Sequence, residues 1–577
     1  MSTTVPGFWY HHSKENRKFT ICTTNYYHFE KFTKKLKIVD EAYPLFLKSI
    51  SNQLNKVHRL NWKTNDWEII IGTWVKKYLI VIADRMSIIE NNIDKGDEFF
   101  FQKKKKSSVS LNSRDISEFI SNIFNDDWNE EIFIRLHNYK VTNDLSNLLF
   151  KEKINIKYIK KSLLKKFKIQ IYNLITNIYV KIFCSKSRII FFKPYFGSKI
   201  KFLSLLVDLK EFPIIYYLDN DPINVQYDPE LRSKINLNLH QTEFYKIASL
   251  LFNECFPRIY LEGFSEILNK IKKTSLPNNK KIIFTCNIHN DSIFKFWTAI
   301  QKNIGAKLII AQHGGGYNLF KYDEKRDYQL SICDKFLTTG WSYKKYEKKI
   351  EKFSIISNEV YRDKSDYGDK IYLIMNNYDN YIYSADYFTS IDLINSEKNR
   401  NYLELHEISE FLDKLNPEIR KKIILRPHPN HRRRHTTKHF EEVFKDKITI
   451  NSNFKIPVMK LLKEARINIV PQPYGTTFVH SMSKNYPTVT LFPHDLVYLN
   501  YETKNVFEGL FNAGICHKDS ESLKSFIEKN FHNYSKWWES AKTQNAKNLF
   551  CEVQGRVLPN RMELLRDILL KEKKKIT

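Results

Sequence analysis

Glycine is scarce in this chain, yet three glycines stand together beside a histidine. The sequence has 15 glycines in 577 residues, and the run Gln312–Gly316 (QHGGG) directly follows the apolar residues 307–311. Glycine lets the backbone take positive φ values and approach a ligand closely. His313 has a side chain that can transfer a proton near neutral pH. We interpret the run as a ligand-binding loop between a strand and a helix N-terminus that faces an anion. In the simpler interpretation it is a tight turn.

A second histidine stands between two prolines after another apolar stretch. His428 is flanked by Pro427 and Pro429, with Arg426 before them and Asn430 after them. Prolines fix their own φ and restrict the preceding residue, so we expect a stiff, extended loop. An imidazole beside a guanidinium suits recognition of a phosphate or a sugar carboxylate. Prolines that only end a strand would give the same pattern.

A third candidate is a hydroxyl-rich segment that opens a helix. Tyr474, Gly475, Thr476 and Thr477 follow the apolar residues 467–470. We expect Thr476 or Thr477 to cap the helix, because Thr is a common N-cap residue. The N-terminus of such a helix is a seat for phosphate. An ordinary capped helix start is the alternative.

Other polar side chains that follow expected strands are weaker candidates. Asp291 or Glu262 could serve as an acid or base, and Asn376 closes the first strand of the last strand series. A role as helix cap or loop residue explains each of them as well. The same applies to Lys193, Tyr195, Ser198, Asn287, His289 and Asn377.

The elements that must position these residues form two series of alternating strands and helices. The first series has expected strands at 188–192, 213–218, 281–286, 307–311 and 335–338, with helices at 197–209 and 291–304. A charged helical connector, 342–352, leads to the second series. Its expected strands are 370–375, 421–425, 448–450, 467–470 and 488–492, with helices at 404–415, 457–464 and 477–484. Alternation of this kind predicts parallel sheets with helices on both faces.

Helical periodicity dominates the two ends of the chain. The first 150 residues are expected to be mainly helical, with the best candidates at 40–55 and 67–91, and the chain from residue 520 onward is also expected to be helical. We therefore predict a helical extension (1–150), a first Rossmann-like domain (151–345) and a second one with C-terminal helices (346–577). Ligands of such sheets bind beyond the carboxyl ends of the strands. The pair Trp537 and Trp538 is interpreted as packing.

The formal net charge of +29 raises the question of a polyanionic partner. Basic runs are scattered along the chain, and no nucleic-acid-binding signature accompanies them. We attribute most of the charge to a lysine-rich composition, with attraction to anionic lipid headgroups or a phosphorylated substrate as a second effect. Nucleic acid is not an expected partner.

The cysteines and the apolar stretches indicate a cytoplasmic protein. Seven cysteines, an odd number without paired metal-ligand spacing, fit a reducing compartment and predict no metal site. Residues 1–10 have no secretory signal pattern, and polar residues interrupt the most apolar stretches, 69–86 and 169–183. We expect a location in the cytoplasm, at most peripheral at the inner face of the inner membrane.

The order of the motifs resembles the O-antigen transferase family of leptospiral surface-carbohydrate clusters, nearly from end to end. The matching segments are Thr23-Thr24, Leu54–His58, Trp67, Ile71–Trp74, Asp84-Arg85, Phe294–Trp297, Gln312–Gly315, Arg426–Pro429, Tyr474–Phe478 and Trp537-Trp538. The Gln-His-Gly and Arg-Pro-His-Pro pair is also similar to that of capsule Kdo transferases and CDP-glycerol polymer synthases. The resemblance implies a GT-B-like α/β fold, in which two Rossmann-like domains face a cleft. Gly316 departs from the usual two glycines.

The resemblance also implies a function. The second domain would hold the nucleotide of a sugar donor and the first domain the acceptor, and the His-Pro motif is associated with CMP-activated acidic sugars such as Kdo or a nonulosonic acid. We expect a glycosyltransferase of surface-polysaccharide synthesis that needs no metal and no cofactor besides its nucleotide-sugar co-substrate. Its partners would be that donor, a glycan or lipid-linked acceptor, and an anionic inner-membrane surface.

Roles for individual residues follow from this hypothesis. Catalysis is assigned to His313 and His428, with Asp291 or Glu262 as an alternative base. The residues expected to bind the donor and its phosphate are Gly314, Gly315, Asn376, Arg426, Asn430, Tyr474, Gly475, Thr476 and Thr477. Two alternatives remain: a CDP-alditol phosphotransferase of the teichoic-acid kind, and a noncatalytic glycan- or nucleic-acid-binding protein.

Overall fold

The computed structural model describes most of the chain. The described residues are 3–5, 20–21, 29–93, 98–99, 101, 110–142, 171, 174–175, 178–179, 182, 187–195, 199–211, 223, 225–273, 282–289, 291–354, 368–375, 403–429, 438–493 and 495–575. Several predicted features fall outside these ranges: the strand at 213–218, Ser198, Asn376, Asn377 and Asn430.

Within the described ranges, the first sheet has five parallel strands in sequential order. They are β4 (Ile189–Phe192), β5 (Ile282–Thr285), β6 (Lys307–Ala311), β7 (Lys335–Thr338) and β8 (Ile350–Lys352). The first four are almost wholly buried, as expected for a parallel sheet covered on both faces. Strand β8 is a correction, because the connector at 342–352 is not one helix. A short 3-10 helix η4 (Lys344–Lys349) is followed by a partly exposed edge strand, with Ile350 paired to Phe336.

The second sheet has six parallel strands in the order β11-β10-β9-β12-β13-β14. Their bounds are β9 (Ile371–Ile374), β10 (Ile423–Arg426), β11 (Thr449–Ile450), β12 (Ile467–Ile469), β13 (Thr488–Leu491) and β14 (Cys516–His517). Written as 3-2-1-4-5-6, this is the order of a Rossmann fold, and the direction of winding reverses between β9 and β12. All five expected strands are confirmed.

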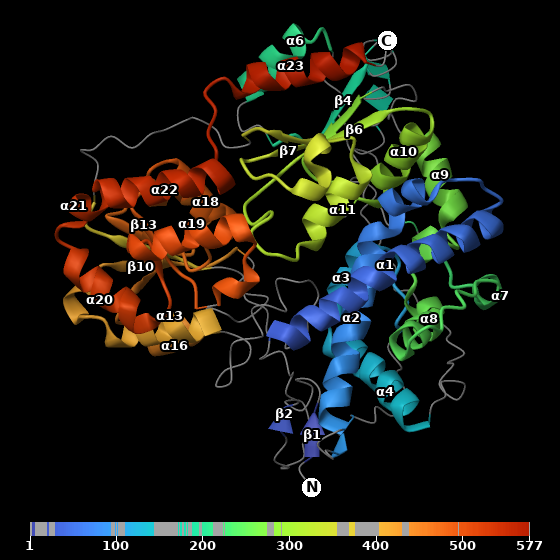
Figure 1. Cartoon of the computed structure of the whole chain (residues 1–577), viewed down its shortest axis with the longest axis horizontal. Coiled ribbons are helices and arrows are strands. Elements are labelled where there is room, and N and C mark those ends of the chain that lie inside the picture. The colour runs from blue at the N-terminus through green and yellow to red at the C-terminus, as the bar shows by residue number, and fades with distance from the viewer. Residues whose placement is uncertain are drawn as a thin grey trace.

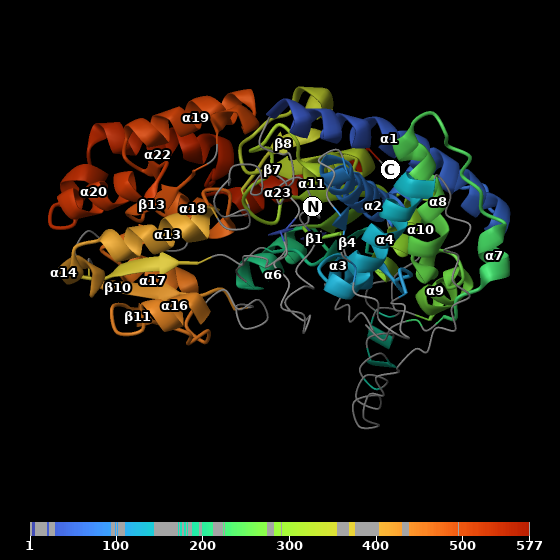
Figure 2. The same ribbon diagram turned by 90° about the horizontal axis from the view of Figure 1, so that it is seen from below.

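Helices from the first part of the chain pack together beside the first sheet. They are α1 (Phe29–His58), α2 (Thr64–Ile93), α3 (Ile116–Ile123), α4 (Asp126–Thr142), α7 (Pro229–Ser233), α8 (Glu243–Cys255), η3 (Arg258–Tyr260) and α9 (Phe264–Lys272). The expected helical character is confirmed, although β1 (Thr3–Val5), β2 (Thr20–Ile21) and β3 (Glu98–Phe99) form a small sheet there. Helix α2 packs against α10 (Ser292–Asn303) and α11 (Glu324–Ile332), and these helices share one hydrophobic core (Figure 2).

The second sheet lies between two further sets of helices. They are α13 (Leu403–Lys414), α14 (Pro417–Arg420), α16 (Lys438–Val443), α17 (Val458–Glu464), α18 (Thr476–Ser483), η5 (Leu496–Tyr498), α19 (Tyr501–Asn512), α20 (Ser520–Asn530), α21 (Tyr534–Trp538) and α22 (Ala541–Gln554). Trp538 is buried, and both tryptophans of α21 donate hydrogen bonds to backbone oxygens, of Ala513 and Asn485. They therefore contribute to packing, as expected.

The final helix leaves the second domain and returns to the first. After α22, helix α23 (Arg561–Lys574) lies beside α6 (Lys199–Asp208) at the top of Figure 1. Leu565 and Leu569 enter the core on the outer face of the first sheet, together with Ile189 and Leu205. Two parallel-sheet domains joined in this way form a GT-B-like α/β architecture. Among the described residues, no helix is long and apolar enough to cross a membrane.

Candidate functional site

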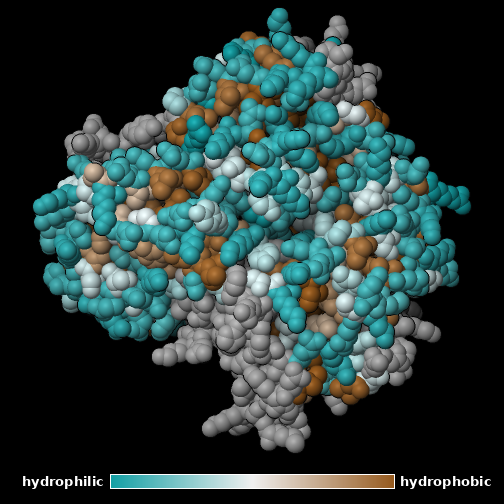
Figure 3. All heavy atoms as spheres, in the orientation of Figure 1, coloured by the Kyte–Doolittle hydropathy of each residue, from teal (hydrophilic) through white to brown (hydrophobic). Residues whose placement is uncertain are grey.

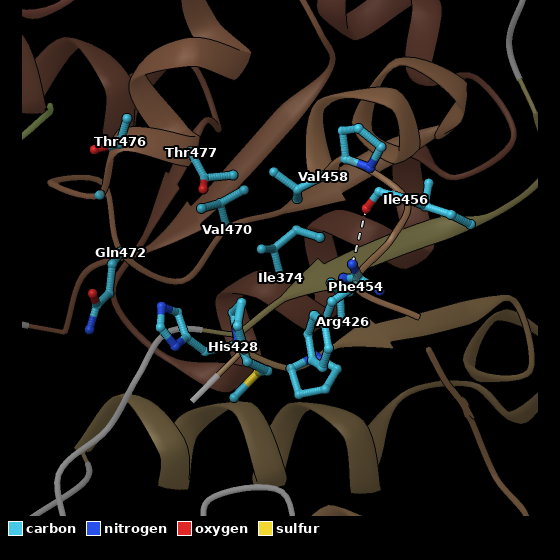
Figure 4. Close-up of a pocket in the computed structure, with 15 residues that line it drawn as sticks. Ile374, Arg426, His428, Phe454, Ile456, Val458, Val470, Gln472, Thr476 and Thr477 are labelled. Carbon is cyan, nitrogen blue, oxygen red and sulfur yellow. Dashed lines mark hydrogen bonds between the residues drawn. The ribbon is translucent and has the colours of Figure 1, made fainter. Parts of the chain in front are cut away.

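A cavity opens at the carboxyl ends of the second sheet, where the winding reverses. Its volume is about 440 Å³, which lies within the range of ligand pockets. Residues at or after the ends of β9, β10, β11 and β12 form it, as the topology of a Rossmann fold predicts. The lining residues are Ile374, Met375, Arg426, Pro427, His428, Pro429, Phe454, Ile456, Pro457, Val458, Val470, Gln472, Gly475, Thr476 and Thr477 (Figure 4).

His428 lies in this cavity because of its place after β10. The strand ends at Arg426, and the half-buried His428 follows between its two prolines without helix or strand geometry. The structure thus agrees with the expected loop at a strand end, and the imidazole lines the cavity. Its catalytic role stays a prediction.

Arg426 lines the same cavity, but its guanidinium holds a loop. Nη1 donates to the backbone oxygen and Oδ1 of Asn451, at 3.1 and 3.2 Å, and Nη2 donates to the backbone oxygen of Ile456 at 3.1 Å (Figure 4). The guanidinium also lies over the Phe454 ring, 4.5 Å from its centroid. Since Phe454 and Ile456 line the cavity, Arg426 fixes one of its walls. The sequence did not predict this task.

Helix α18 begins at the cavity without a side-chain cap. Gly475 is the N-cap residue, and it supplies no side-chain hydrogen bond to the first turn. The prediction that Thr476 or Thr477 caps the helix is therefore wrong, because both residues already belong to its first turn. Amides of an uncapped first turn carry partial positive charge and can bind an anion. Both threonines line the cavity at this point.

The glycine run contacts the second domain. The Gly315 amide donates to Oγ1 of Thr476 at 3.1 Å, and a Cβ added to Gly314 would lie 2.7 Å from the same oxygen. Gly316 has φ +83°, and a Cβ there would lie 2.9 Å from the carbonyl oxygen of Tyr474. Because these glycines have no side chains, the two domains can approach each other closely here.

The helix after the glycine run does not begin at the run, as was predicted. Helix α11 begins only at Glu324, and the Asp323 carboxylate caps it by accepting from the Lys325 and Arg326 amides. The prediction that the helix after the glycine run binds an anion is therefore wrong. The uncapped helix end that the run reaches is that of α18, about 160 positions later in the chain.

His313 lies two residues after the end of β6 and two residues before Gly315, whose amide contacts α18. It is half-buried, and its Nδ1 lies 2.8 Å from the Tyr317 hydroxyl. Burial lowers the pKa of His313 to about 4, so the imidazole is neutral at physiological pH. It is not among the residues that line the cavity, but Thr476 is. Thr476, at the N-terminus of α18, therefore links the loop that carries His313 to the cavity that His428 lines.

The two candidate carboxylates have structural partners. Asp291 is the N-cap of α10, where it accepts from the Phe294 amide at 3.0 Å, and Lys193 Nζ lies 3.4 Å away. Burial raises the pKa of Asp291. The simpler interpretation as a cap thus describes its contacts, and its role as a base stays a prediction.

Glu262 forms a buried ion pair with Arg232. Its two oxygens accept from Arg232 Nε and Nη2 at 2.6 and 2.9 Å, and one of them also lies 3.2 Å from the Asp228 amide. A carboxylate held in this way stabilises the packing of α7 against the segment before α9. The role of Glu262 as a base stays a prediction.

Several residues of the site carry no sequence signal of their own. Tyr317, Gln329 and His289 form a polar group around His313, and only His289 stood out in the sequence, as a residue after a strand. Gln472 and Phe454 line the cavity outside any motif. Tyr474, predicted to bind the donor, packs against Phe320 of the first domain, with ring centroids 5.7 Å apart.

Comparison with known sequences decides the family. A model of the LIC12162 family transferases matches residues 3–569 of this chain. The chain belongs to the LIC12162 family of transferases. Among curated proteins, the sequence of this family member has no match.

Solved structures give only distant likenesses to this LIC12162 family transferase. The wall teichoic acid polymerase TagF is 11% identical with a TM-score of 0.34, over 72% of this chain and 100% of its own. UDP-GlcNAc 2-epimerase from Neisseria meningitidis bound to UDP-GlcNAc is 11% identical with a TM-score of 0.34, over 65% and 90%. UDP-N-acetylglucosamine 2-epimerase from Rickettsia bellii is 13% identical with a TM-score of 0.33, over 67% and 96%.

Proposed function

We propose that this transferase is a glycosyltransferase of bacterial surface-polysaccharide synthesis. It would move a sugar from a nucleotide donor to a glycan or lipid-linked acceptor. The observation that carries the proposal is the cavity at the winding reversal of the second sheet, with His428 and the uncapped N-terminus of α18 on its lining. A nucleotide phosphate fits this place, because helix N-termini and strand ends of Rossmann folds bind phosphates.

The polar groups of the cavity favour an anionic donor. Arg426 ends one strand and His428 follows it, and Gln472 and Thr477 follow another strand. Most of these polar side chains can donate hydrogen bonds. Phe454 and Ile456, in the loop that Arg426 holds, give the cavity apolar side chains. Such side chains suit packing against a nucleotide base or a sugar ring. We propose a CMP-activated acidic sugar, such as Kdo or a nonulosonic acid, as the donor.

The reaction would depend on stabilising the departing nucleotide. The bond between the anomeric carbon and the phosphate oxygen breaks, and the acceptor oxygen forms a new bond to that carbon. Charge that develops on the phosphate would be stabilised by the α18 amides, Thr477 and His428, which are fixed before the reaction. The acceptor hydroxyl must lose a proton, and the candidate bases are His313 and Asp291.

Nucleotide titration tests the proposal. Calorimetry with CMP, CDP, UDP and GDP should show CMP binding that weakens in a His428→Ala variant. Binding of none of the four would contradict the proposal and favour a noncatalytic binding protein. With a donor that binds, the mass of the product separates sugar transfer from alditol phosphate transfer, because only the latter adds a phosphate.

An anionic membrane is the proposed location of the reaction. Helix α6 exposes three apolar side chains on one face, Ile200 (80%), Leu203 (53%) and Val207 (75%). Exposed lysines lie on the same two neighbouring helices. Lys201 is on α6 and Lys210 comes two residues after its end, and α23 carries Lys571 and Lys574. In Figure 3, brown patches among hydrophilic residues occupy the top of the molecule, where Figure 1 places these helices. Apolar side chains among lysines suit an anionic lipid surface.

Vesicle flotation tests this location. The protein should float with vesicles that contain phosphatidylglycerol and remain unbound with pure phosphatidylcholine. A combined Ile200→Ser, Leu203→Ser and Val207→Ser variant should lose binding. A matched control replaces Leu250, Ile304 and Leu549, which are exposed elsewhere, by Ser and should bind as the unmodified protein does. Equal loss in both variants would contradict the proposal.

A further inference from the structure

A chain of buried polar side chains leads from the interior of the first domain to His313. The Tyr317 hydroxyl lies 2.8 Å from Nδ1 of His313. Gln329 on α11 forms a side-chain hydrogen bond to Tyr317, and its Nε2 lies 2.9 Å from Nε2 of His289. Tyr317 and Gln329 are buried. The chain thus connects two imidazoles through one amide and one phenol.

The direction of these hydrogen bonds follows from the atoms involved. An amide nitrogen can only donate, so Nε2 of Gln329 donates to Nε2 of His289. The side-chain hydrogen bond with Gln329 acts to lower the pKa of the Tyr317 phenol. Burial nevertheless raises the Tyr317 pKa well above its ordinary value, so the phenol keeps its proton. That proton is then available to Nδ1 of His313.

A buried lysine helps to maintain this direction. Lys295 on α10 is fully buried, and its Nζ donates to Oγ1 of Thr73 at 2.9 Å. Burial, and then the charge of Lys295, lower the His289 pKa well below its ordinary value. A neutral His289 keeps a lone pair on Nε2 to accept from Gln329. A protonated His289 would instead donate, and the amide of Gln329 would have to reverse.

We propose that Tyr317 is a positioning residue that holds His313 as its Nε2–H tautomer, so that this imidazole acts as a hydrogen-bond donor to the phosphate of the sugar donor and not as a base. The inference rests on the proposed glycosyl transfer. It chooses between two roles for His313, since Nδ1 accepts from Tyr317 and Nε2 carries the proton. The acceptor proton would then pass to Asp291, whose pKa is raised by burial.

The tautomer can be measured without any turnover. In protein labelled with ¹³C and ¹⁵N only in histidine, ring nitrogen and Cδ2 chemical shifts distinguish the two tautomers, and a His313→Gln variant assigns the signal. We expect the Nε2–H form, and a mixture of both forms in Tyr317→Phe. An Nδ1–H signal in the unmodified protein would overturn the inference, whether or not the protein transfers a sugar.

Turnover measurements then test whether His313 acts as a hydrogen-bond donor. His313→Gln keeps an N–H group but cannot act as a base, so it should retain more activity than His313→Ala. Tyr317→Phe should lower kcat roughly tenfold, as expected for a lost hydrogen bond to a reacting group, with little change in the donor KM. In the His313→Gln background it should cause no further loss, because Tyr317 acts through His313.

A second buried phenol provides the control. The Tyr78 hydroxyl donates to the backbone oxygen of Ala248 at 2.6 Å, within the helical layer. Tyr78→Phe should leave kcat unchanged while removing a similar buried hydroxyl. Equal inactivity of His313→Gln and His313→Ala, with an independent loss from Tyr317→Phe, would overturn the donor role. Absence of transfer by the unmodified protein would contradict the proposed function, and the tautomer measurement would still decide this inference.

Discussion

The amide of Gly315 donates a hydrogen bond to Oγ1 of Thr476, and this bond joins the two domains at the edge of the cavity. Further hydrogen bonds between the domains involve Leu319, four residues after Gly315. Leu319 accepts from the Asn500 amide at 3.0 Å and from the Thr503 hydroxyl at 2.6 Å. Because Thr476 also lines the cavity, the first domain holds the helix end at which we propose that the phosphate binds.

A side chain at Gly315 should disturb this contact. A Cβ there would lie 3.1 Å from backbone atoms of Gly475 and 2.9 Å from Val479 Cγ2, so Gly315→Ala must push α18 away. We expect a loss of about 1–3 kcal/mol in the free energy of unfolding and weaker nucleotide binding. Urea unfolding and calorimetry measure the two effects. The control is Gly509→Ala in α19, where a Cβ meets no atom within 4 Å among the described residues. It should be neutral or slightly stabilising, and the same loss there would refute the argument.

The two histidines should affect turnover much more than stability. Neither imidazole is fully buried, so His428→Ala and His313→Ala should each reduce kcat by about 100-fold or more. Circular dichroism and melting temperature should stay near those of the unmodified protein. Full activity in both variants would end the assignment of the site.

Arg426 should matter through the loop that it holds. Lysine cannot reproduce the fork that reaches Asn451 and Ile456 together, so Arg426→Lys should weaken nucleotide binding and cost about 1–3 kcal/mol of unfolding free energy. Arg420 is the matched control, because its Nη1 also donates to backbone oxygens, of Leu412 and Asp413, on α13. Arg420→Lys should leave nucleotide binding unchanged. Calorimetric affinities that fall equally in both variants would contradict a specific role.

Glu262 should be required for stability and not for chemistry. Glu262→Gln leaves the buried Arg232 without its opposite charge, which costs about 3–5 kcal/mol when a buried pair is broken. The folded fraction should retain the kcat of the unmodified protein. Denaturant unfolding together with active-site titration separates these effects, and a stable but inactive variant would support the catalytic assignment of Glu262.

Lys295 should make stability depend on pH. Burial lowers its pKa to about 7 in the folded protein, whereas the unfolded chain has the ordinary value near 10.5. Between these values the unfolded state binds more protons, so the free energy of unfolding rises with pH. Relative to a Lys295→Met variant, the unmodified protein should gain up to about 1.4 kcal/mol per pH unit between pH 7 and 9. Urea unfolding at pH 7, 8 and 9 provides the comparison, and parallel curves would contradict the shifted pKa.

Most of the fold could be predicted because buried parallel strands are continuous apolar runs. Strands such as Lys307–Ala311 and Lys335–Thr338 coincide with their predicted bounds for this reason. Strand β14 was missed because two residues give no periodic signal. Strand β8 was missed because charges surround it, which suits an edge strand but resembles an exposed helix.

The site could be predicted only where it depends on strand ends. His428 was found because residues after parallel strands gather at one edge of a sheet. The partner of Gly315 is a residue 161 positions away, and no local pattern indicates a contact of that kind. The same applies to Arg426, whose loop follows a different strand, and to Thr476, whose hydroxyl is used by the other domain instead of by its own helix.

The return of α23 to the first sheet has a consequence for biosynthesis. Leu565, Ile568 and Leu569 complete the apolar face around Ile189 and Phe284, which were synthesised hundreds of residues earlier. While the ribosome is still translating the second domain, this face of the nascent first domain has no cover from α23. Exposed apolar surface of this kind promotes aggregation and chaperone binding during synthesis. A helix that follows the second domain in the chain therefore completes the core of the first domain.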